Sequence, residues 1–305
     1  MFRKPHLGIL YSRVRVEEKK IFAELDARRV SCDRIHDQTV IFAIEDPAPW
    51  QQYDLVLIRS LSYARGLYAA RILNSWGIPT VNSASVAEIC GDKLATAAAF
   101  QQAGIPQLQT RTAFSVKSAL QAIEEIGYPV VLKPVVGSWG RLLAKINDRE
   151  AAEAILEHKA TLGSYHHSIF VIQEYVEKPG RDIRAIVIGD RTIAAMYRHA
   201  DHWITNTARN GKGKPCPITR ELDELCVAAA QAVGSGAFGV DLIEHPDKGL
   251  ILNEINHTFE FHGAQPVTGV NIPGILVEYL IQQAGSYPVR VPAPNGTVAS
   301  YRAVA

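Results

Sequence analysis

The stretch from Phe238 to Phe261 constrains the chain most strongly, because it predicts two adjacent strands that carry acidic and amide side chains. Apolar residues lead up to a Pro-Asp-Lys-Gly turn at 246–249 and resume directly after it. Glu254 and Asn256 leave the same face of the second strand, and Asp241 on the first strand can lie opposite them. Two carboxylates and an amide oxygen suit Mg²⁺, which commonly also binds nucleotide phosphates. The alternative is that all three are solvated strand residues.

The composition is that of an ordinary globular protein. Of 305 residues, 47% are hydrophobic and 21% are charged, and the formal net charge is +1. No run of apolar residues is long enough to span a membrane, and the opening of the chain does not resemble a signal peptide. The four cysteines form no Cys-x-x-Cys pair, so neither a zinc knuckle nor a disulfide framework is expected. We therefore predict a cytoplasmic protein with no nucleic-acid or membrane partner.

Residues 1–86 alternate between apolar strands and helices. Strands are predicted at His6–Tyr11, at Tyr53–Ile58 and after Gly77, with helices between them. This alternation predicts a small parallel sheet with helices on its faces. Ligands of such sheets bind at the carboxyl ends of the strands, although each polar residue there could equally be an ordinary surface residue. The residues in these positions are Ser12, Arg13, Arg59 and Ser60.

Two predicted strands, Tyr128–Val136 and Arg141–Ile146, flank a glycine-rich turn at Gly137–Gly140. The backbone N–H groups of such a turn can surround phosphate oxygens, but the glycines can also serve the turn alone. Lys133 favours the first interpretation. It lies within an otherwise apolar strand, where an ammonium group is costly unless it meets an anion.

The following segment is predicted to form a strand at Ile169–Tyr175 and then a β-hairpin around Gly189-Asp190. A loop at residues 206–214 is rich in glycine and cations. It is either a solvated loop or a flap over a phosphate or carboxylate, with Arg209 as the best donor. Residues 286–305 are rich in Pro, Ser and Gly and are predicted to be a tail with little order.

Five separated motifs occur in the order found in ATP-grasp ligases, and the chain resembles that superfamily from about residue 6 to residue 285. The motifs are Lys93, Lys133, Gly137–Gly140, Gln173-Glu-Tyr-Val176, and Asp241 with Asn253-Glu-Ile-Asn256. Within the superfamily the chain resembles the RimK-like branch. The narrower resemblance is to ligases that join α-aminoadipate to an amino-group carrier protein in lysine biosynthesis, and it rests on residues 198–209, 253–261 and 267–273.

The resemblance implies an α/β (α+β) ATP-grasp fold in three subdomains. These are an N-terminal pre-ATP-grasp domain at 1–86, a central subdomain with the glycine-rich loop at 87–168, and a C-terminal subdomain with the magnesium site at 169–285, followed by the tail. The two α+β subdomains would grip ATP between them. A homo-oligomer, either a dimer or a tetramer, is also implied.

The resemblance also implies a role for each motif residue. ATP phosphates would be bound by Lys93, Lys133, Gly137, Ser138, Trp139 and Gly140. Adenine would be held by Gln173, Glu174, Tyr175 and Val176, and the ribose by Asp182. Two Mg²⁺ ions would be held by Asp241, Glu254 and Asn256.

Two further sets follow from the same resemblance. The catalytic residues would be Arg198, Asn206 and Arg209, with the arginines neutralising the transferring phosphoryl group. The amino-acid pocket would be lined by His257, Thr258, Phe259 and Phe261.

The implied reaction needs no enzyme nucleophile. The side-chain carboxylate of the C-terminal glutamate of a small acidic carrier protein attacks ATP to give an acyl phosphate, and the α-amino group of α-aminoadipate then displaces phosphate. Two departures from the family pattern, Asn210-Gly-Lys-Gly-Lys214 after Arg209 and His262-Gly-Ala-Gln265 after Phe261, lie where substrate would bind. The alternatives are a glutamate ligase, acting on a carrier in arginine biosynthesis or as a RimK-type protein glutamylase, and a non-catalytic ATP-binding scaffold.

Overall fold

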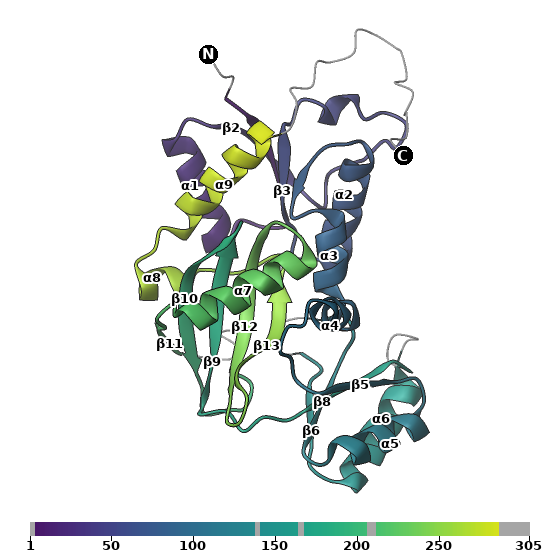
Figure 1. Ribbon diagram of the computed structural model, residues 1–305. Coiled ribbons are helices and arrows are strands. Elements are labelled where there is room, and N and C mark those ends of the chain that lie inside the picture. The colour runs from purple at the N-terminus through teal and green to yellow at the C-terminus, as the bar shows by residue number, and fades with distance from the viewer. Residues whose placement is uncertain (1–3, 138–140, 164–167, 206–211, 287–305) are drawn as a thin grey trace.

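The computed structural model describes residues 4–137, 141–163, 168–205 and 212–286, which form three sheets and the helices packed on them (Figure 1). The N-terminal sheet is parallel and the other two are antiparallel. This arrangement confirms the predicted fold class. Ser138, Trp139, Gly140, Asn206 and Arg209 lie outside the described residues, as does the segment from 287 to 305.

The N-terminal sheet has the strand order β2-β1-β3-β4. Helix α2 begins at Tyr63, earlier than its apolar pattern suggests, because the Ser62 side chain caps it by accepting a hydrogen bond from Arg65 N. Strand β2 was not predicted, since its polar sequence Ser-Cys-Asp-Arg-Ile-His lies at the sheet edge and lacks the apolar signal of a core strand. The elements are β1 (His6–Tyr11), α1 (Val16–Ala27), β2 (Ser31–His36), a 3-10 turn (Ala48–Trp50), β3 (Leu55–Arg59), α2 (Tyr63–Ser75) and β4 (Thr80–Val81).

The last described helix, α9 (Ile272–Ser286), returns to the N-terminal sheet and lies beside α1 (Figure 1). Its apolar side chains, including Leu276 and Leu280, share one core with Leu7 and Ile21. Helix α2 covers the opposite face of the sheet. The N-terminal core therefore depends on residues from both ends of the described chain.

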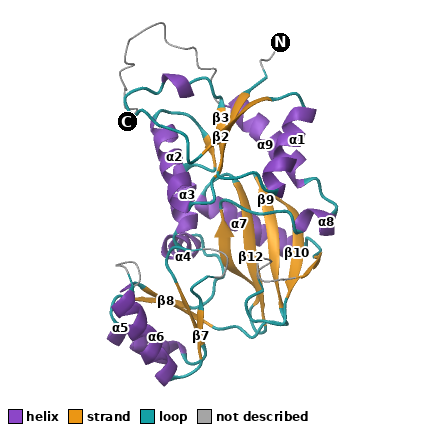
Figure 2. Ribbon diagram, turned by 180° about the vertical axis from the view of Figure 1, so that it is seen from behind, coloured by secondary structure: helices purple, strands orange, loops and turns teal. Residues whose placement is uncertain are grey.

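The central sheet has the order β5-β8-β6-β7, with α5 and α6 packed against one face (Figure 2). Strand β6 ends at Lys133, because Pro134 has no N–H to continue the ladder. Its partner β7 begins at Ala144 and is shorter than predicted. The elements are β5 (Thr110–Ala113), α5 (Val116–Ile126), β6 (Val130–Lys133), β7 (Ala144–Ile146), α6 (Arg149–Leu162) and β8 (Phe170–Glu174).

The C-terminal sheet has the order β11-β10-β9-β12-β13 and is covered on both faces. The predicted hairpins are confirmed in β9–β10 and in β12–β13. Seven consecutive buried residues of β12 include one carboxylate, Asp241. The elements are α3 (Ala84–Gly91), α4 (Lys93–Gln102), β9 (Arg181–Ile188), β10 (Arg191–His199), β11 (Lys212–Pro215), α7 (Arg220–Val233), β12 (Ala237–His245), β13 (Gly249–Asn256) and α8 (Ala264–Thr268).

Within the described ranges, no helix has both the length and the apolar character needed to cross a bilayer.

A buried amide joins the N-terminal sheet to the C-terminal one. Asn82, just after β4, donates from Nδ2 to the carbonyl of Ala237 at 2.8 Å, and its Oδ1 accepts from Ala237 N at 2.8 Å. The neighbouring Gly236 leaves room for this contact, since a Cβ atom there would lie 1.9 Å from Asn82 Oδ1. A side chain at position 236 would therefore have to displace the Asn82 side-chain amide, which makes two hydrogen bonds to Ala237.

We expect Gly236→Ala to lower the free energy of unfolding by about 1–3 kcal/mol, the usual cost of overpacking. Urea denaturation would measure it. The matched control is Gly285→Ala on α9, where a Cβ would have no neighbour within 4 Å and should not destabilise the helix. Equal effects of the two substitutions would contradict the close packing at Gly236.

Candidate active site

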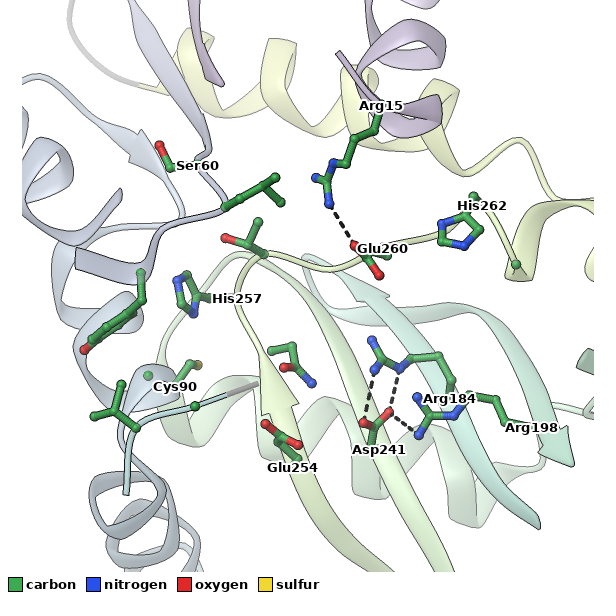
Figure 3. Close-up of a pocket in the computed structure, with 18 of the residues that line it drawn as sticks. Arg15, Ser60, Cys90, Arg184, Arg198, Asp241, Glu254, His257, Glu260 and His262 are labelled. Carbon is green, nitrogen blue, oxygen red and sulfur yellow. Dashed lines mark hydrogen bonds and ion pairs between the residues drawn. The ribbon is translucent and has the colours of Figure 1, made fainter. Parts of the chain in front are cut away.

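The three predicted metal ligands come together on adjacent strands. Asp241 of β12 pairs in register with Glu254 of β13, and Gly239 pairs with Asn256. All three side chains line a cavity of about 170 Å³ (Figure 3). Asn256 Nδ2 lies 3.5 Å from the carbonyl of Gly239, which leaves its amide oxygen as the available acceptor. Two carboxylates and one amide oxygen fit the oxygen preference of Mg²⁺.

Asp241 is buried, with 2% of its surface exposed, and two arginines hold it in place. Arg184 Nη2 donates to Asp241 Oδ2 at 3.1 Å, and Arg198 Nη2 lies 3.1 Å from Oδ1. Arg198 also binds both oxygens of Asp182 at 2.7 Å. Burial alone would lower the pKa of Arg198, but the Asp241 and Asp182 carboxylates raise it above its usual value. Arg198 thus reaches the cavity already bonded to two carboxylates.

A second cavity, of about 70 Å³, contains the predicted nucleotide residues of the central and C-terminal sheets. Asp182 lines it, although both of its oxygens accept hydrogen bonds from Arg198. The Glu174 carboxylate accepts a hydrogen bond from Gln109 N, and Lys248 lies 3.0 Å from it. The predicted residues found here are Lys133, Gln173, Glu174, Tyr175, Val176 and Asp182.

Two ammonium groups line this second cavity, that of the buried Lys133 and that of the half-buried Lys178. Lys133 Nζ donates to Asn253 Oδ1 at 3.0 Å, and Lys178 Nζ donates to Thr205 Oγ1 at 3.1 Å. Burial lowers the pKa of Lys133 to about 8 and also lowers that of Lys178. Both hydrogen-bond partners, Asn253 and Thr205, are neutral, so neither bond compensates the charge of its amine. The cavity is therefore suited to an anion.

Lys178 was not identified from the sequence. It stands directly before Pro179-Gly180, where a lysine looks like an ordinary turn residue. Only the fold turns its side chain towards Thr205, Asp182 and Lys133. The remaining predicted lysine, Lys93, opens α4 and donates from Nζ to the carbonyl of Gly137 at 2.9 Å. Gly137 itself lines the first cavity.

The segment after β13 alternates between the core and the first cavity. His257 and Thr258 line the cavity, as predicted residues of the amino-acid pocket. Phe259 and Phe261 do not, because both are buried in the core shared with α1 and α9. The structure does not support a pocket-lining role for these two residues, because from Thr258 onward the side chains alternate, with 258, 260 and 262 at the cavity and 259 and 261 in the core.

The same alternation brings Glu260, which was not predicted, and His262, from the segment expected near the substrate, to the cavity wall. Arg15 joins them from the start of α1, with its Nη1 2.8 Å from Glu260 Oε1 (Figure 3). His257 is enclosed beside Tyr63, and burial lowers its pKa to about 4, so its imidazole is neutral at pH 7.

N-terminal side chains hold the backbone of this segment. Arg59 Nη1 donates to the carbonyl of Phe259 at 2.9 Å. Glu17 Oε1 accepts from Phe261 N at 3.1 Å and from His262 N at 3.0 Å. Asn82 Nδ2 donates to the carbonyl of His257 at 2.6 Å. The wall of the cavity is therefore fixed by residues far away in sequence.

Comparison with protein families identifies two matched regions. Residues 7–89 match the LysX preATP-grasp domain, and residues 90–280 match the RimK-like ATP-grasp domain. The chain belongs to the RimK-like ATP-grasp family. The predicted resemblance, and with it the prediction of an ATP-grasp ligase, is confirmed.

Two curated relatives show how this RimK-like chain compares with named ligases. The glutamate–LysW ligase ArgX of Sulfurisphaera tokodaii is 35% identical, over 88% of this chain and 95% of its own length. The α-aminoadipate–LysW ligase LysX of the same organism is 34% identical, over 91% of this chain and 97% of its own length. These identities do not separate the two kinds of ligase.

Solved structures agree with the family assignment. A RimK domain ATP-grasp protein from Sphaerobacter thermophilus superposes with a TM-score of 0.77 at 25% identity, covering 90% of this chain and 99% of that one. The D-alanine–D-alanine ligase of Bacillus anthracis, solved with ATP, gives a TM-score of 0.69 at 17% identity, covering 92% and 98%. The second comparison shows the fold alone.

We expect the buried charge of Lys133 to make stability depend on pH. Its folded pKa of about 8 lies below its ordinary value of 10.5, so only the unfolded chain holds this proton between these pH values, and stability rises with pH there. Lys133→Met removes the penalty. At pH 7 it should raise the free energy of unfolding by up to about 3 kcal/mol, and the gain should vanish towards pH 10.5.

Urea denaturation across this pH range would measure the difference between the two proteins. The control is Lys19→Met, because Lys19 is exposed on α1. A Lys133→Met variant that is less stable than wild type at pH 7, or whose gain is the same at every pH, would refute a destabilising buried charge.

Proposed function

We propose that the protein is an ATP-dependent carboxylate–amine ligase that joins the α-amino group of α-aminoadipate to the C-terminal glutamate side chain of a small acidic carrier protein. One observation carries this proposal. Asn253 lines the cavity that holds Lys133 and Lys178, and the next residue of β13, Glu254, lines the cavity of the metal ligands. A polyanion in the second cavity can thus place its reactive end beside the first.

The cavity with Lys133 and Lys178 suits ATP. Both ammonium groups would meet its phosphates, and the segment Gln173–Val176 with Asp182 would contact adenine and ribose. Lys93 and Gly137, which are joined by the hydrogen bond from Lys93 Nζ to the Gly137 carbonyl, would also bind phosphate. These proposed roles follow the sequence prediction, and we add Lys178 to them because it lines the same cavity.

Asp241, Glu254 and Asn256 would hold Mg²⁺, with two ions expected, and the metal would neutralise charge on the phosphates. The structural contacts suggest a different role for Arg198 from the one predicted. Because it binds Asp182 and Asp241 together, we propose that it orients both carboxylates. Arg209 and Asn206 remain predicted contacts of the transferring phosphoryl group.

The reaction follows in two steps. A carboxylate oxygen of the carrier attacks the γ-phosphorus, the bond to ADP breaks, and an acyl phosphate forms. The amine nitrogen then attacks the acyl carbon, a C–N bond forms, and the bond to phosphate breaks, with two protons lost from the original ammonium group. The protein supplies positioning and charge, which dominate catalysis of phosphoryl transfer.

Glutamate is the second candidate for the amine, because the relatives named ArgX and LysX are almost equally similar to this chain. The two amino acids differ by one methylene, which a pocket distinguishes by only about 1–3 kcal/mol. We take LysW, the protein in the names of both relatives, as the model for the carrier. The implied homo-oligomer stays a prediction that light scattering would test.

With magnesium, ATP and LysW, we expect ADP release to be at least about tenfold faster with α-aminoadipate than with glutamate at equal subsaturating concentration. A coupled assay of ADP would measure both rates, with reactions lacking LysW as the control. Faster release with glutamate would transfer the proposal to the ArgX-type reaction. Absence of release with either amine would refute the ligase proposal.

We expect Glu254→Ala to abolish magnesium-dependent ADP release while changing the free energy of unfolding by less than about 1 kcal/mol, because Glu254 lines a cavity and does not belong to the apolar core. Denaturation and the ADP assay would be run on the same preparation. Glu278→Ala, at an exposed position of α9, should retain full activity. Substantial turnover by Glu254→Ala would exclude Glu254 from the metal site.

A further inference from the structure

We propose that Glu260 and Arg15 bind the α-ammonium and α-carboxylate groups of the amino-acid substrate. This inference rests on the proposed function, because it assigns two further residues of the same site. Arg15 lies outside the motifs that carry the family resemblance, whereas Glu260 lies within one of them, residues 253–261, but was given no role from the sequence. The two residues are 245 positions apart.

The two side chains meet at the wall of the first cavity. Arg15 reaches in from the start of α1, and Glu260 from the segment after β13, with 2.8 Å between Arg15 Nη1 and Glu260 Oε1 (Figure 3). Thr258 and His257, on the same segment, continue the wall towards Asn256 and Glu254. An amine bound at Glu260 would therefore share a cavity with the proposed site of acyl-phosphate formation.

Arg15 is oriented before any substrate binds. Its Nε and Nη2 donate to the two oxygens of Glu18, at 3.0 and 2.9 Å. Glu18 is fully buried and is fixed in turn by Arg59 at 3.0 Å. The guanidinium plane is thus held from one side, and Nη1 faces the cavity, where a carboxylate can be bound with little loss of entropy.

Glu260 is fixed at its backbone but not at its carboxylate. The neighbouring backbone groups are bonded to Arg59 at Phe259 and to Glu17 at Phe261. In the part of the chain that the structure describes, Arg15 is the only partner of the Glu260 carboxylate. The side chain is 34% exposed, so its second carboxylate oxygen, Oε2, remains open to a cation in the cavity.

An α-amino acid can insert into this ion pair without leaving either residue unpaired. It carries its ammonium and carboxylate on the same carbon, which matches two opposite charges that already lie in contact. Arg15 would exchange the Glu260 carboxylate for the substrate carboxylate, and Glu260 would exchange the Arg15 guanidinium for the substrate ammonium. No buried charge is then left without compensation. The pair would recognise the part common to all α-amino acids, and the length of the side chain would be judged elsewhere in the cavity.

The first test separates amino-acid binding from activation of the carrier. Hydroxylamine traps an acyl phosphate as a hydroxamate without needing a binding site for an amino acid. With magnesium, ATP and LysW, Glu260→Gln should raise the KM for the amino acid at least about tenfold. The rate of hydroxamate formation should stay within about twofold of wild type.

Glu24→Gln is the matched control for Glu260→Gln. Glu24 is also a partly exposed carboxylate that links α1 to the C-terminal part of the chain, through Asn271 at 2.7 Å, but it lies outside the cavity. Glu24→Gln should leave both the KM for the amino acid and the rate of hydroxamate formation unchanged. An unchanged KM in Glu260→Gln would overturn the inference, and so would an equal loss of hydroxamate. If wild type forms no hydroxamate, the proposed function fails instead.

The second test assigns the carboxylate that Arg15 binds. Wild type should use α-aminoadipate at least about tenfold better than its α-amide, and Arg15→Gln should abolish this preference. If Arg15→Gln does not fold, Arg15→Lys keeps the charge, loses the planar fork and should reduce the preference. Loss of discrimination against the side-chain amide of α-aminoadipate, with the α-amide preference intact, would show that Arg15 binds the side-chain carboxylate and would overturn the assignment.

Discussion

The active-site wall depends on a buried set of charges at the junction between the N-terminal and C-terminal parts of the chain. Glu18 binds both Arg59 and Arg15, while Glu17 and Arg59 bind the backbone of the segment after β13. Charges in such places are costly unless they are paired, and removing one partner typically costs about 3–5 kcal/mol. This network ties the substrate-facing residues to the N-terminal sheet. It gives that sheet a direct role in shaping the site.

The two cavities differ in their balance of charge. In the first, Arg184 and Arg198 are both paired with Asp241, and Arg198 also binds Asp182 of the second cavity, so the arginines are already neutralised. In the second, Lys133 is buried and Lys178 is half-buried, and their hydrogen-bond partners, Asn253 and Thr205, are neutral. A polyanion is attracted to the second cavity, and a zwitterion suits the first. This difference agrees with ATP in one cavity and an amino acid in the other.

Regular apolar patterns predicted most of the fold. The strands β1, β3, β9, β10, β12 and β13 and the helix α7 follow clear periodicities, and turns at Gly189-Asp190 and Pro246–Gly249 define the two hairpins. The polar strands β2 and β5 gave no such signal, because edge positions do not require alternating burial. The packing of α9 on the N-terminal sheet could not be predicted either, since the apolar pattern of a helix does not specify which surface it covers.

The sequence by itself determined that Asp241, Glu254 and Asn256 converge, because a short turn and the two-residue period of strands fix which side chains share a face. It also marked Lys133, since a lysine within an apolar strand is conspicuous. Only the tertiary structure decided that Phe259 and Phe261 enter the core, that Lys178 faces the lysine cavity, and that Arg15 meets Glu260. The reason is physical: local patterns report on neighbours along the chain, whereas these contacts join segments that approach each other only when separate sheets pack together.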